Sequence, residues 1–357
     1  MVKSGILARY GEFLGLGPLS TVISLDEGDT PLVEARRLPE VCGVPIRLFF
    51  KFEGSNPTGS FKDRGMTAAV SKAVSQGARA LVCASTGNTA ASASAYAARA
   101  GLHSLVLLPR GKVALGKMAQ SLVYGAVVVA VDANFDAALE IVRRLPERFP
   151  LTIVNSINPD RIAGQMSAAF EVVDQLRGAP EYHALPVGNA GNITATWAGY
   201  RKYSEAGKCR RLPIMLGFQA AGAAPIVDGH PIENPQTVAT AIRIGNPASW
   251  KGASDAARES GGFIDKVTDE EILEAYFLLA RTEGLFCEPA SAASLAGVLK
   301  KARAGYFPFE SRVVCTLTGN GLKDPDTAMT VEKRLIETSG SFDDVCAALA
   351  PVLAGQS

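Results

Sequence analysis

Short apolar runs that alternate with alanine-rich helical stretches limit how this chain can fold more than any other feature. Strands that alternate with helices of this size are typical of repeated βα units, which build parallel sheets. Continuous apolarity within the runs predicts strands that are buried on both faces. We therefore predict an α/β protein with open, twisted, parallel sheets. The runs lie at residues 80–85, 104–109, 126–131, 151–156, 184–187, 214–218 and 313–319.

The length of the chain indicates more than one domain. At 357 residues it exceeds the size of one ordinary compact core, so we predict two open α/β domains. The smaller is expected to span 55–151 and to be inserted in a larger domain formed by 1–54 together with 152–357. In open α/β sheets, ligands bind beyond the carboxyl ends of the strands, so loops that follow a strand are the places to look for chemistry.

One lysine stands directly after a turn and at the mouth of a predicted helix. It is Lys62, within the segment NPTGSFKDRG (56–65). Ser60 and Asp63 resemble a capping box, which predicts that the helix begins near Phe61. In the first helical turn, the helix dipole and partial burial both disfavour an ammonium ion and favour a neutral, nucleophilic amine. Taken alone, the residue fits equally an exposed lysine on an amphipathic helix.

Three loops that follow strands carry hydroxyls, amides or glycines. The loop ASTGNT (84–89) offers N–H groups and hydroxyls at a helix N-terminus for a carboxylate or phosphate, with helix capping as the alternative. The loop GNAGNI (188–193) has two glycines that let the backbone approach an anion, with a ligand-free turn as the alternative. In TLTGNG (316–321), a hydroxyl at the strand end can meet the ring nitrogen of a flat cofactor, which alone is a weak signal.

An imine-forming lysine, an anion cradle and a terminal hydroxyl together indicate pyridoxal phosphate, which supplies an electron sink while the protein orients it. The chain lacks the GK[ST] of a nucleotide P-loop and the GxGxxG of dinucleotide binders, which argues against an NAD-dependent dehydrogenase. A non-catalytic protein on the same scaffold would have lost the lysine or the glycine loop, and neither is lost.

Composition bears on partners and location. A net charge of +1 gives no electrostatic case for nucleic acid, and no apolar run is long enough to span a bilayer. The N-terminus lacks the apolar core of a secretion signal. Six cysteines without a CxxC pair and three separated histidines argue against a disulfide framework and a structural zinc site. We expect a cytoplasmic protein with no metal, nucleic-acid or membrane partner.

Read together, the motifs closely resemble those of fold-type II pyridoxal-phosphate enzymes, the group of tryptophan synthase β, cysteine synthase and threonine dehydratase. The resemblance extends from Asp26 to Asp326. Within the group, the GNAGN loop, NSINPDR (155–161) and IRIGNPASW (242–250) are similar to threonine synthases of the shorter bacterial type. The motifs that carry the resemblance are, in order, GDTPL, NPTGSFKDRG, STGNTAAS, GNAGN, EPASA and TGNG.

This resemblance implies an activity and a cofactor. The activity is that of a pyridoxal-phosphate-dependent lyase which converts O-phospho-L-homoserine and water to L-threonine and phosphate by γ-elimination and β-addition. A serine or threonine dehydratase of the same fold is the alternative. A homodimer is the usual state of relatives. Lys62, carried by the smaller domain, would form the Schiff base and act as the catalytic base, Asn88 would meet the 3′-oxygen, and Thr318 would face the pyridine nitrogen. A threonine there, unlike an aspartate, is not expected to stabilise a protonated ring.

The resemblance also implies how two phosphates and the substrate are held. The cofactor phosphate would lie in the cup formed by Gly188, Asn189, Ala190, Gly191 and Asn192. The substrate α-carboxylate would lie near Ser85, Thr86 and Thr89. The substrate phosphate would be held by Asn155, Ser156 and Arg161, with Thr89 and Asn189 nearby.

Arg161 has a physical warrant of its own. Residues 155–156 end an apolar run, and Arg161 follows at the start of a predicted helix, which directs it toward the same sheet edge. Arginine binds a phosphate by a bidentate fork that lysine cannot reproduce. A dehydratase that acts on serine or threonine would not need this cation. A surface arginine paired with Asp160 is the alternative.

Overall fold

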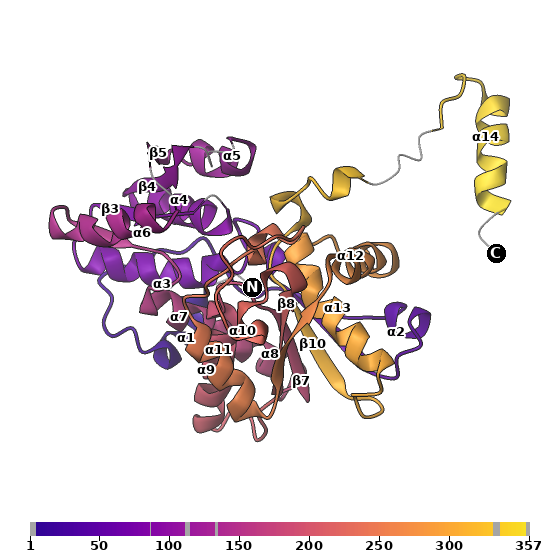
Figure 1. Cartoon of the computed structure of the whole chain (residues 1–357), viewed down its shortest axis with the longest axis horizontal. Helices are drawn as coiled ribbons and strands as arrows, with labels where there is room; N and C mark the ends of the chain where they lie inside the picture. Colours follow the sequence, from indigo (N-terminus) through magenta and orange to yellow (C-terminus); the bar gives the residue numbers. More distant parts are fainter. Residues whose placement is uncertain (1–4, 86, 111–114, 133–134, 331–335, 355–357) are drawn as a thin grey trace. The chain divides into compact units, whose positions relative to one another are not determined.

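The computed structural model describes residues 5–85, 87–110, 115–132, 135–330 and 336–354. The chain divides into two compact units, Met1–Asp324 and Pro325–Ser357. The first unit contains two open sheets flanked by helices (Figure 1). The predicted fold class is therefore confirmed. The division into an inserted domain and a surrounding one stays a prediction.

The larger sheet has the strand order β1-β2-β10-β7-β8-β9. All neighbours pair in parallel except β1, which runs antiparallel to β2. The apolar runs predict β7, β8 and β10. They do not mark β1, which is short, or β2 and β9, which carry charged residues. The bounds are β1 (Leu32–Glu34), β2 (Arg47–Phe52), β7 (Tyr182–Pro186), β8 (Ile214–Ala220), β9 (Phe263–Val267) and β10 (Arg312–Leu317).

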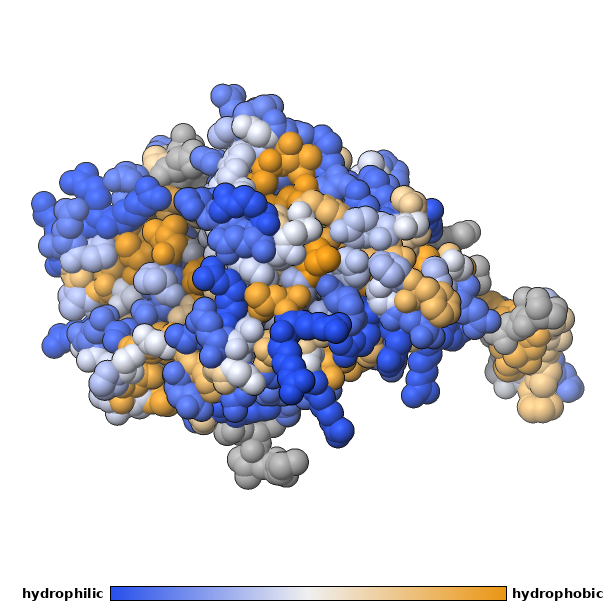
Figure 2. Space-filling model, turned by 90° about the horizontal axis from the view of Figure 1, so that it is seen from below, coloured by the Kyte–Doolittle hydropathy of each residue, from blue (hydrophilic) through white to orange (hydrophobic). Residues whose placement is uncertain are grey.

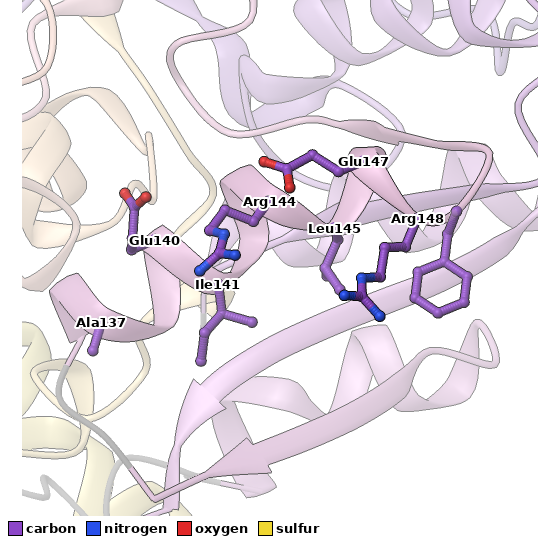
Figure 3. A pocket seen from close by; sticks show the side chains of 8 residues that line it. Ala137, Glu140, Ile141, Arg144, Leu145, Glu147 and Arg148 are labelled. Carbon is purple, nitrogen blue, oxygen red and sulfur yellow. The ribbon is translucent and has the colours of Figure 1, made fainter.

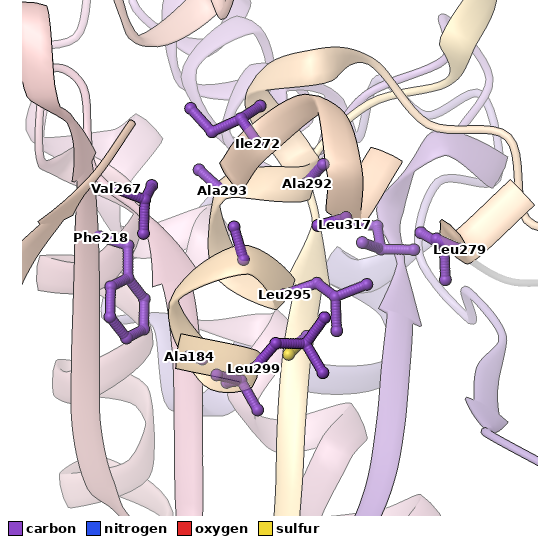
Figure 4. Packing of buried hydrophobic residues seen from close by; sticks show 14 of the residues in the cluster. Ala184, Phe218, Val267, Ile272, Leu279, Ala292, Ala293, Leu295, Leu299 and Leu317 are labelled. Atoms are coloured by element: carbon purple, nitrogen blue, oxygen red, sulfur yellow. The ribbon is translucent and has the colours of Figure 1, made fainter. Parts of the chain in front are cut away.

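Helices pack on both faces of the larger sheet. On one face α12 and α13 bury side chains such as Leu295 and Leu299 against Ala184 and Phe218 (Figure 4). On the other face α1, α8, α9 and α11 pack around a second core. Ligands can therefore reach this sheet only at its strand ends. The helices are α1 (Ile6–Leu14), α2 (Leu38–Val41), α8 (Ser167–Leu176), α9 (Gly191–Glu205), α10 (Pro225–Asp228), α11 (Trp250–Ser260), α12 (Asp269–Glu283) and α13 (Pro289–Arg303).

The smaller sheet is parallel throughout, with the order β5-β4-β3-β6. Helices α3, α4 and α5 share one core with it, and α6 packs on its other face. The prediction of burial on both faces is wrong for β5, since Val127 and Val129 are 53% and 40% exposed on this edge strand. The elements are β3 (Ala80–Cys83), β4 (His103–Pro109), β5 (Val127–Val131), β6 (Leu151–Ile153), α3 (Lys62–Ser75), α4 (Asn88–Ala100), α5 (Leu115–Val123), α6 (Phe135–Arg144) and α7 (Pro159–Gln165).

The second unit contains the helix α14 (Phe342–Ala354) and the short helix η7 (Ala328–Thr330). No helix in the described ranges is long and apolar enough to cross a bilayer. On the face of the molecule seen in Figure 2, hydrophilic side chains interrupt the apolar groups. That face therefore offers no broad continuous apolar surface.

Candidate active site

Backbone pairing joins the turn before Lys62 to the loop that follows β10. Ser60 forms an isolated antiparallel bridge with Gly319. The N–H of Phe61 donates to the carbonyl of Thr318 at 3.0 Å. Two motifs that lie far apart in the sequence thus meet at the carboxyl end of the larger sheet.

Helix α3 begins at Lys62, close to the predicted start, but the predicted capping box is wrong. No side chain caps the helix from Phe61. The carboxylate of Asp63 instead accepts from the N–H and the hydroxyl of Thr58, at 2.7 and 2.6 Å, and from the hydroxyl of Ser92 at 2.6 Å. Asp63 is fully buried, so its carboxylate fixes the turn and α4 to α3 instead of closing the helix end.

The side-chain amine of Lys62 has the properties of a nucleophile. It lies 4.2 Å from the centroid of the Phe61 ring. Burial, reinforced by the charge of Arg161 and opposed by that of Glu288, lowers the pKa of Lys62 to about 7. A large fraction of the amine is therefore neutral near neutral pH.

A close contact between α3 and α7 brings Arg161 toward Lys62. A Cβ on Gly65 would lie 2.7 Å from the carbonyl oxygen of Arg161, and a Cβ on Gly164 would lie 2.1 Å from that of Arg64. Side chains at the contact set the distance between packed helices, so two glycines allow an unusually close approach. The glycines thereby place two cationic side chains in one region.

Arg161 is fully buried, so the surface arginine paired with Asp160 is ruled out. Asn158 caps the start of α7 by accepting from the N–H groups of Asp160 and Arg161. The Nη1 of Arg161 donates to the carbonyl of Val154 at 3.0 Å, whereas its Nε and Nη2 have no partner among the described atoms. Burial lowers its pKa to about 10. Buried donors without acceptors are rare in folded proteins, so this guanidinium calls for an anion.

The segment 188–192 comprises a short loop and the first two residues of α9, and it has the form of an anion cup. Ala190 adopts a left-handed conformation with φ of 65°, and a Cβ on Gly188 would lie 2.8 Å from the Cα of Ile242. Within the described chain, none of the N–H groups of residues 189–192 donates a hydrogen bond. The amide Nδ2 of Asn192 is also buried without a partner. These donors at a helix N-terminus match the requirements of a phosphate.

Asn88 and Thr318 are joined by a residue to which the sequence assigns no role. The Nδ2 of Asn88 donates to Oε2 of Glu288 at 3.0 Å, and the hydroxyl of Thr318 lies 3.1 Å from Oε1. Burial raises the pKa of Glu288, which is 3% exposed. The EPASA motif contains this residue, but nothing in its sequence indicates where the carboxylate points.

Ser156, Thr89 and Ser85 are three of the residues predicted to bind the substrate. Ser156 accepts from Asn189 at 2.8 Å, which links the loop after β6 to the anion cup. Thr89 is buried in the first turn of α4. The Oγ of Ser85 accepts from the N–H of Gly87 at 3.3 Å.

Asn155 and Thr86 are also predicted to bind the substrate. Both polar atoms of Asn155 are taken by the backbone of Ala84, at 3.1 Å each. This side chain therefore ties β6 to the loop after β3, and its role toward the substrate stays a prediction. Thr86 lies outside the described residues.

A buried ion cluster next to Lys62 is not predicted from the sequence. Arg64 donates to both carboxylate oxygens of Glu53, at 2.7 and 2.8 Å, and to both of Glu171, at 2.9 and 2.6 Å. Lys51 donates to Glu171 at 2.8 Å and to the carbonyl of Thr30. Its four charged residues are at most 1% exposed. The partners are distant in sequence, so no local pattern marks them.

A groove of about 370 Å³ runs along α6 and the short helix η3 (Leu145–Glu147) (Figure 3). It contains none of the predicted site residues. Ile141 and Phe149 are its exposed apolar members. The chemistry-bearing residues lie instead at the strand ends.

Comparison with known proteins identifies the family to which the chain belongs. The family model described as pyridoxal-phosphate dependent enzyme matches residues 23–319. The chain is 57% identical to the threonine synthase of Synechocystis sp. over 325 residues, which cover 91% of this chain and 85% of the relative. It is 58% identical to the threonine synthase of Mycobacterium leprae over 326 residues, which cover 91% and 90%.

A solved structure with a similar fold is a threonine deaminase from T.th., with 26% identity and a TM-score of 0.70. The match covers 89% of this chain and 98% of that one. The fold is thus common to proteins whose names denote different reactions. The buried guanidinium of Arg161, with Nε and Nη2 unpaired among the described atoms, is the feature of this site that bears on which reaction applies.

Proposed function

The chain belongs to the family of pyridoxal-phosphate-dependent enzymes, and on that premise we propose that it is a threonine synthase. It converts O-phospho-L-homoserine and water to L-threonine and phosphate. The observation that carries this choice over a dehydratase is Arg161, a fully buried cation with two unpaired donors beside the reactive lysine. A phosphorylated substrate supplies an anion in addition to its α-carboxylate, and serine or threonine has no such second anion.

The donors of this chain fit the cofactor. Loop 188–192 presents unpaired N–H groups and the unpaired amide of Asn192, which suit a dianionic phosphate. Lys62 offers a partly neutral amine to the aldehyde. Asn88 would meet the 3′-oxygen of the cofactor, and Thr318 would face the nitrogen of its pyridine ring. When bound, pyridoxal phosphate supplies the electron sink for carbanion chemistry on an amino acid.

Side chains of this protein transfer the protons, neutralise the leaving phosphate and bind the α-carboxylate. Lys62, in its neutral form, takes the proton from Cα of the substrate and later moves the proton at Cβ. Arg161 neutralises the phosphate as it leaves Cγ, with the hydroxyl of Ser156 and the amide of Asn189 as further donors. Ser85, Thr86 and Thr89 would hold the α-carboxylate. Burial keeps water from these charges and so strengthens each interaction.

The direct test is to supply the purified protein with pyridoxal phosphate and O-phospho-L-homoserine and to measure phosphate and threonine together. We expect equal amounts of both products. The Lys62→Ala variant should lose turnover and the visible absorbance of the lysine-bound cofactor, while the wild type keeps both. Product formation by Lys62→Ala at the wild-type rate would contradict the role of this lysine.

Arg161 separates the two candidate reactions. Replacing it with methionine, which keeps an apolar stem but has no charged group, should reduce kcat/KM for phosphohomoserine at least ~100-fold, because it removes a charge-assisted phosphate contact. Cofactor affinity and any slow deamination of serine should change little. An equal loss for serine and for phosphohomoserine would favour the dehydratase alternative.

The proposed function also predicts an oligomeric state and a cellular location. We expect a homodimer and a cytoplasmic enzyme, and the six free cysteines support the latter. Sedimentation equilibrium on the holoenzyme tests the dimer. A mass of one chain at micromolar concentration would contradict it.

A further inference from the structure

Gln165, the last residue of α7, has a buried amide that the roles described above leave unused. Its side chain is 4% exposed, and its Oε1 has no hydrogen-bond partner in the part of the chain that the structure describes. An amide oxygen only accepts hydrogen bonds, and buried acceptors are rarely left without a donor. The oxygen of this amide therefore calls for a donor that the described chain does not supply.

The position of the amide places it beside the reactive lysine. A Cβ on Gly65 would lie 2.9 Å from Nε2 of Gln165. Lys62 and Gly65 are three residues apart on α3, and so they share one face of that helix. A Cβ tilts toward the N-terminus of its helix, which is the end at which Lys62 stands. The amide of Gln165 thus lies along α3, on the face that carries Lys62.

The same amide follows Arg161 by one helical turn. Residues four apart share a face of a helix, so the two side chains leave α7 on the same side. The carbonyl oxygen of Arg161 would lie 2.7 Å from the same Cβ on Gly65, which shows that both residues border this glycine. Arg161 contributes two unpaired donors and Gln165 an unpaired acceptor. One region therefore suits an anion together with a neutral group that has a proton to donate.

The proposed reaction includes such a group, and the present inference rests on that proposed function. Threonine formation consumes one water molecule, yet the charged side chains of the site are buried, so solvent does not bathe them. The reacting water therefore needs a bound position. A phosphate dianion has no proton to offer to Oε1 of Gln165, whereas water has two. Buried water molecules commonly bind polar groups that would otherwise be unpaired.

We propose that Gln165 binds and orients the water that adds to Cβ of the substrate. Its Oε1 accepts one proton of the water, which leaves a lone pair of the water oxygen free to attack Cβ. The oxygen bonds to Cβ, and one water proton ends on the released phosphate, since an amide is not basic enough to keep it. The proton removed from Cβ reaches Cγ through Lys62, where it replaces the phosphate. The products are threonine and hydrogen phosphate, and every atom is accounted for.

The orientation of this water decides which product leaves the enzyme. Without it, phosphate can still be lost, because Lys62 and Arg161 remain in place. The four-carbon unit then leaves as 2-aminobut-2-enoate, which solvent water converts to 2-oxobutyrate and ammonium. The ratio of threonine to phosphate therefore reports the role of Gln165, whereas a merely structural role would lower both products equally.

The test measures threonine, phosphate and 2-oxobutyrate formed from phosphohomoserine by the holoenzyme. Gln165→Met keeps the length of the side chain but has no amide. We expect the ratio of threonine to phosphate to fall at least ~5-fold, because a poorly oriented reactant reacts more slowly. 2-Oxobutyrate should make up the difference. Cofactor binding, followed by its visible absorbance, should stay as in the wild type.

Gln175→Met is the matched control. Gln175 of α8 donates to the carbonyl of Thr30 at 3.0 Å and accepts from Lys51 at 2.9 Å, so its amide is already paired. This variant should form equal amounts of threonine and phosphate. Equal amounts from Gln165→Met would overturn the proposal and leave the proposed function standing. A wild type that released no phosphate would overturn both.

If Gln165→Met does not fold, two polar variants decide the question. Gln165→Glu keeps an acceptor oxygen at the same length, so the two products should stay equal, while its negative charge raises KM for phosphohomoserine. Gln165→Asn withdraws the amide by one methylene, so the ratio of threonine to phosphate should fall. Equal products from Gln165→Asn would refute the proposal, and so would a fallen ratio in Gln165→Glu.

Discussion

The Lys62 amine titrates well below an ordinary lysine because it is buried and because the Arg161 guanidinium lies near it. An unperturbed lysine has a pKa of about 10.4. Between pH 7 and that value the unfolded chain binds a proton at this position that the folded chain does not. The contribution of Lys62 to the free energy of unfolding of the apoprotein therefore rises with pH across this window.

Competitive labelling measures this titration directly. We expect acetylation of Lys62 by trace acetic anhydride to increase with pH, to reach half of its maximum near pH 7 and to level off at higher pH. In guanidinium-denatured protein the same lysine should follow an ordinary amine, with a midpoint near pH 10.4. A folded-state midpoint near pH 10 would show that the amine is charged in the site.

Arg161→Met should move the labelling midpoint of Lys62 upward, because the nearby positive charge is gone. Arg201→Met is the matched control, since Arg201 is an exposed arginine paired with Glu259. Equal midpoints in wild type and Arg161→Met would mean that burial alone sets the pKa of Lys62.

Sequence singles out Lys62 and the glycine loop as candidate site residues, because each depends on a local pattern of a few neighbouring residues. It does not identify Glu288 or Arg64 as part of one buried network. Their partners lie far away in the chain, and only the fold brings them together. The burial of Arg161 is unpredictable for the same reason, since its surroundings come from β3, β6 and α3.

Among the elements, the contact between α3 and α7 sets the spacing of the two cations. Gly164→Ala would insert a Cβ 2.1 Å from the carbonyl oxygen of Arg64. We expect a loss of about 2 kcal/mol in the free energy of unfolding, measured in urea, because overpacked backbone has to move. The labelling midpoint of Lys62 should also change.

Gly11→Ala is the control for this substitution. Gly11 lies inside α1, and a Cβ there would meet nothing within 4 Å. Alanine favours helix over glycine by about 1 kcal/mol, so this variant should be as stable as the wild type or more stable. Equal stability of Gly164→Ala and Gly11→Ala would mean that the α3–α7 contact is loose.

Within the larger sheet, the strands that sequence predicts are those with nearly uniform burial. Strands β7, β8 and β10 lie inside the larger sheet and read as continuous apolar runs. Strand β2 contains the buried Lys51, whose charge is paired only through tertiary contacts. The capping box fails because Asp63 finds partners in Thr58 and Ser92 that the local pattern does not include.

For the molecule as a whole, the ion cluster of Arg64, Glu53, Glu171 and Lys51 joins β2, α3 and α8. Its charges sum to zero, which makes their burial tolerable only while all four are present. Arg64→Met should cost about 3 kcal/mol in unfolding free energy, because two carboxylates lose their bidentate partner. Urea denaturation of the apoprotein measures it. An unchanged midpoint would show that the cluster stabilises little.

The same cluster has a consequence for motion during turnover. Since α3 is tied to residues of β2 and α8, the reactive amine stays in the reference frame of the larger sheet. Helix α4 is in turn held to α3 by the hydrogen bond from the hydroxyl of Ser92 to Asp63. Any opening for substrate entry would therefore keep Asn88 and Lys62 together, and distance probes on α3 and on α4 would both keep their separation from β2.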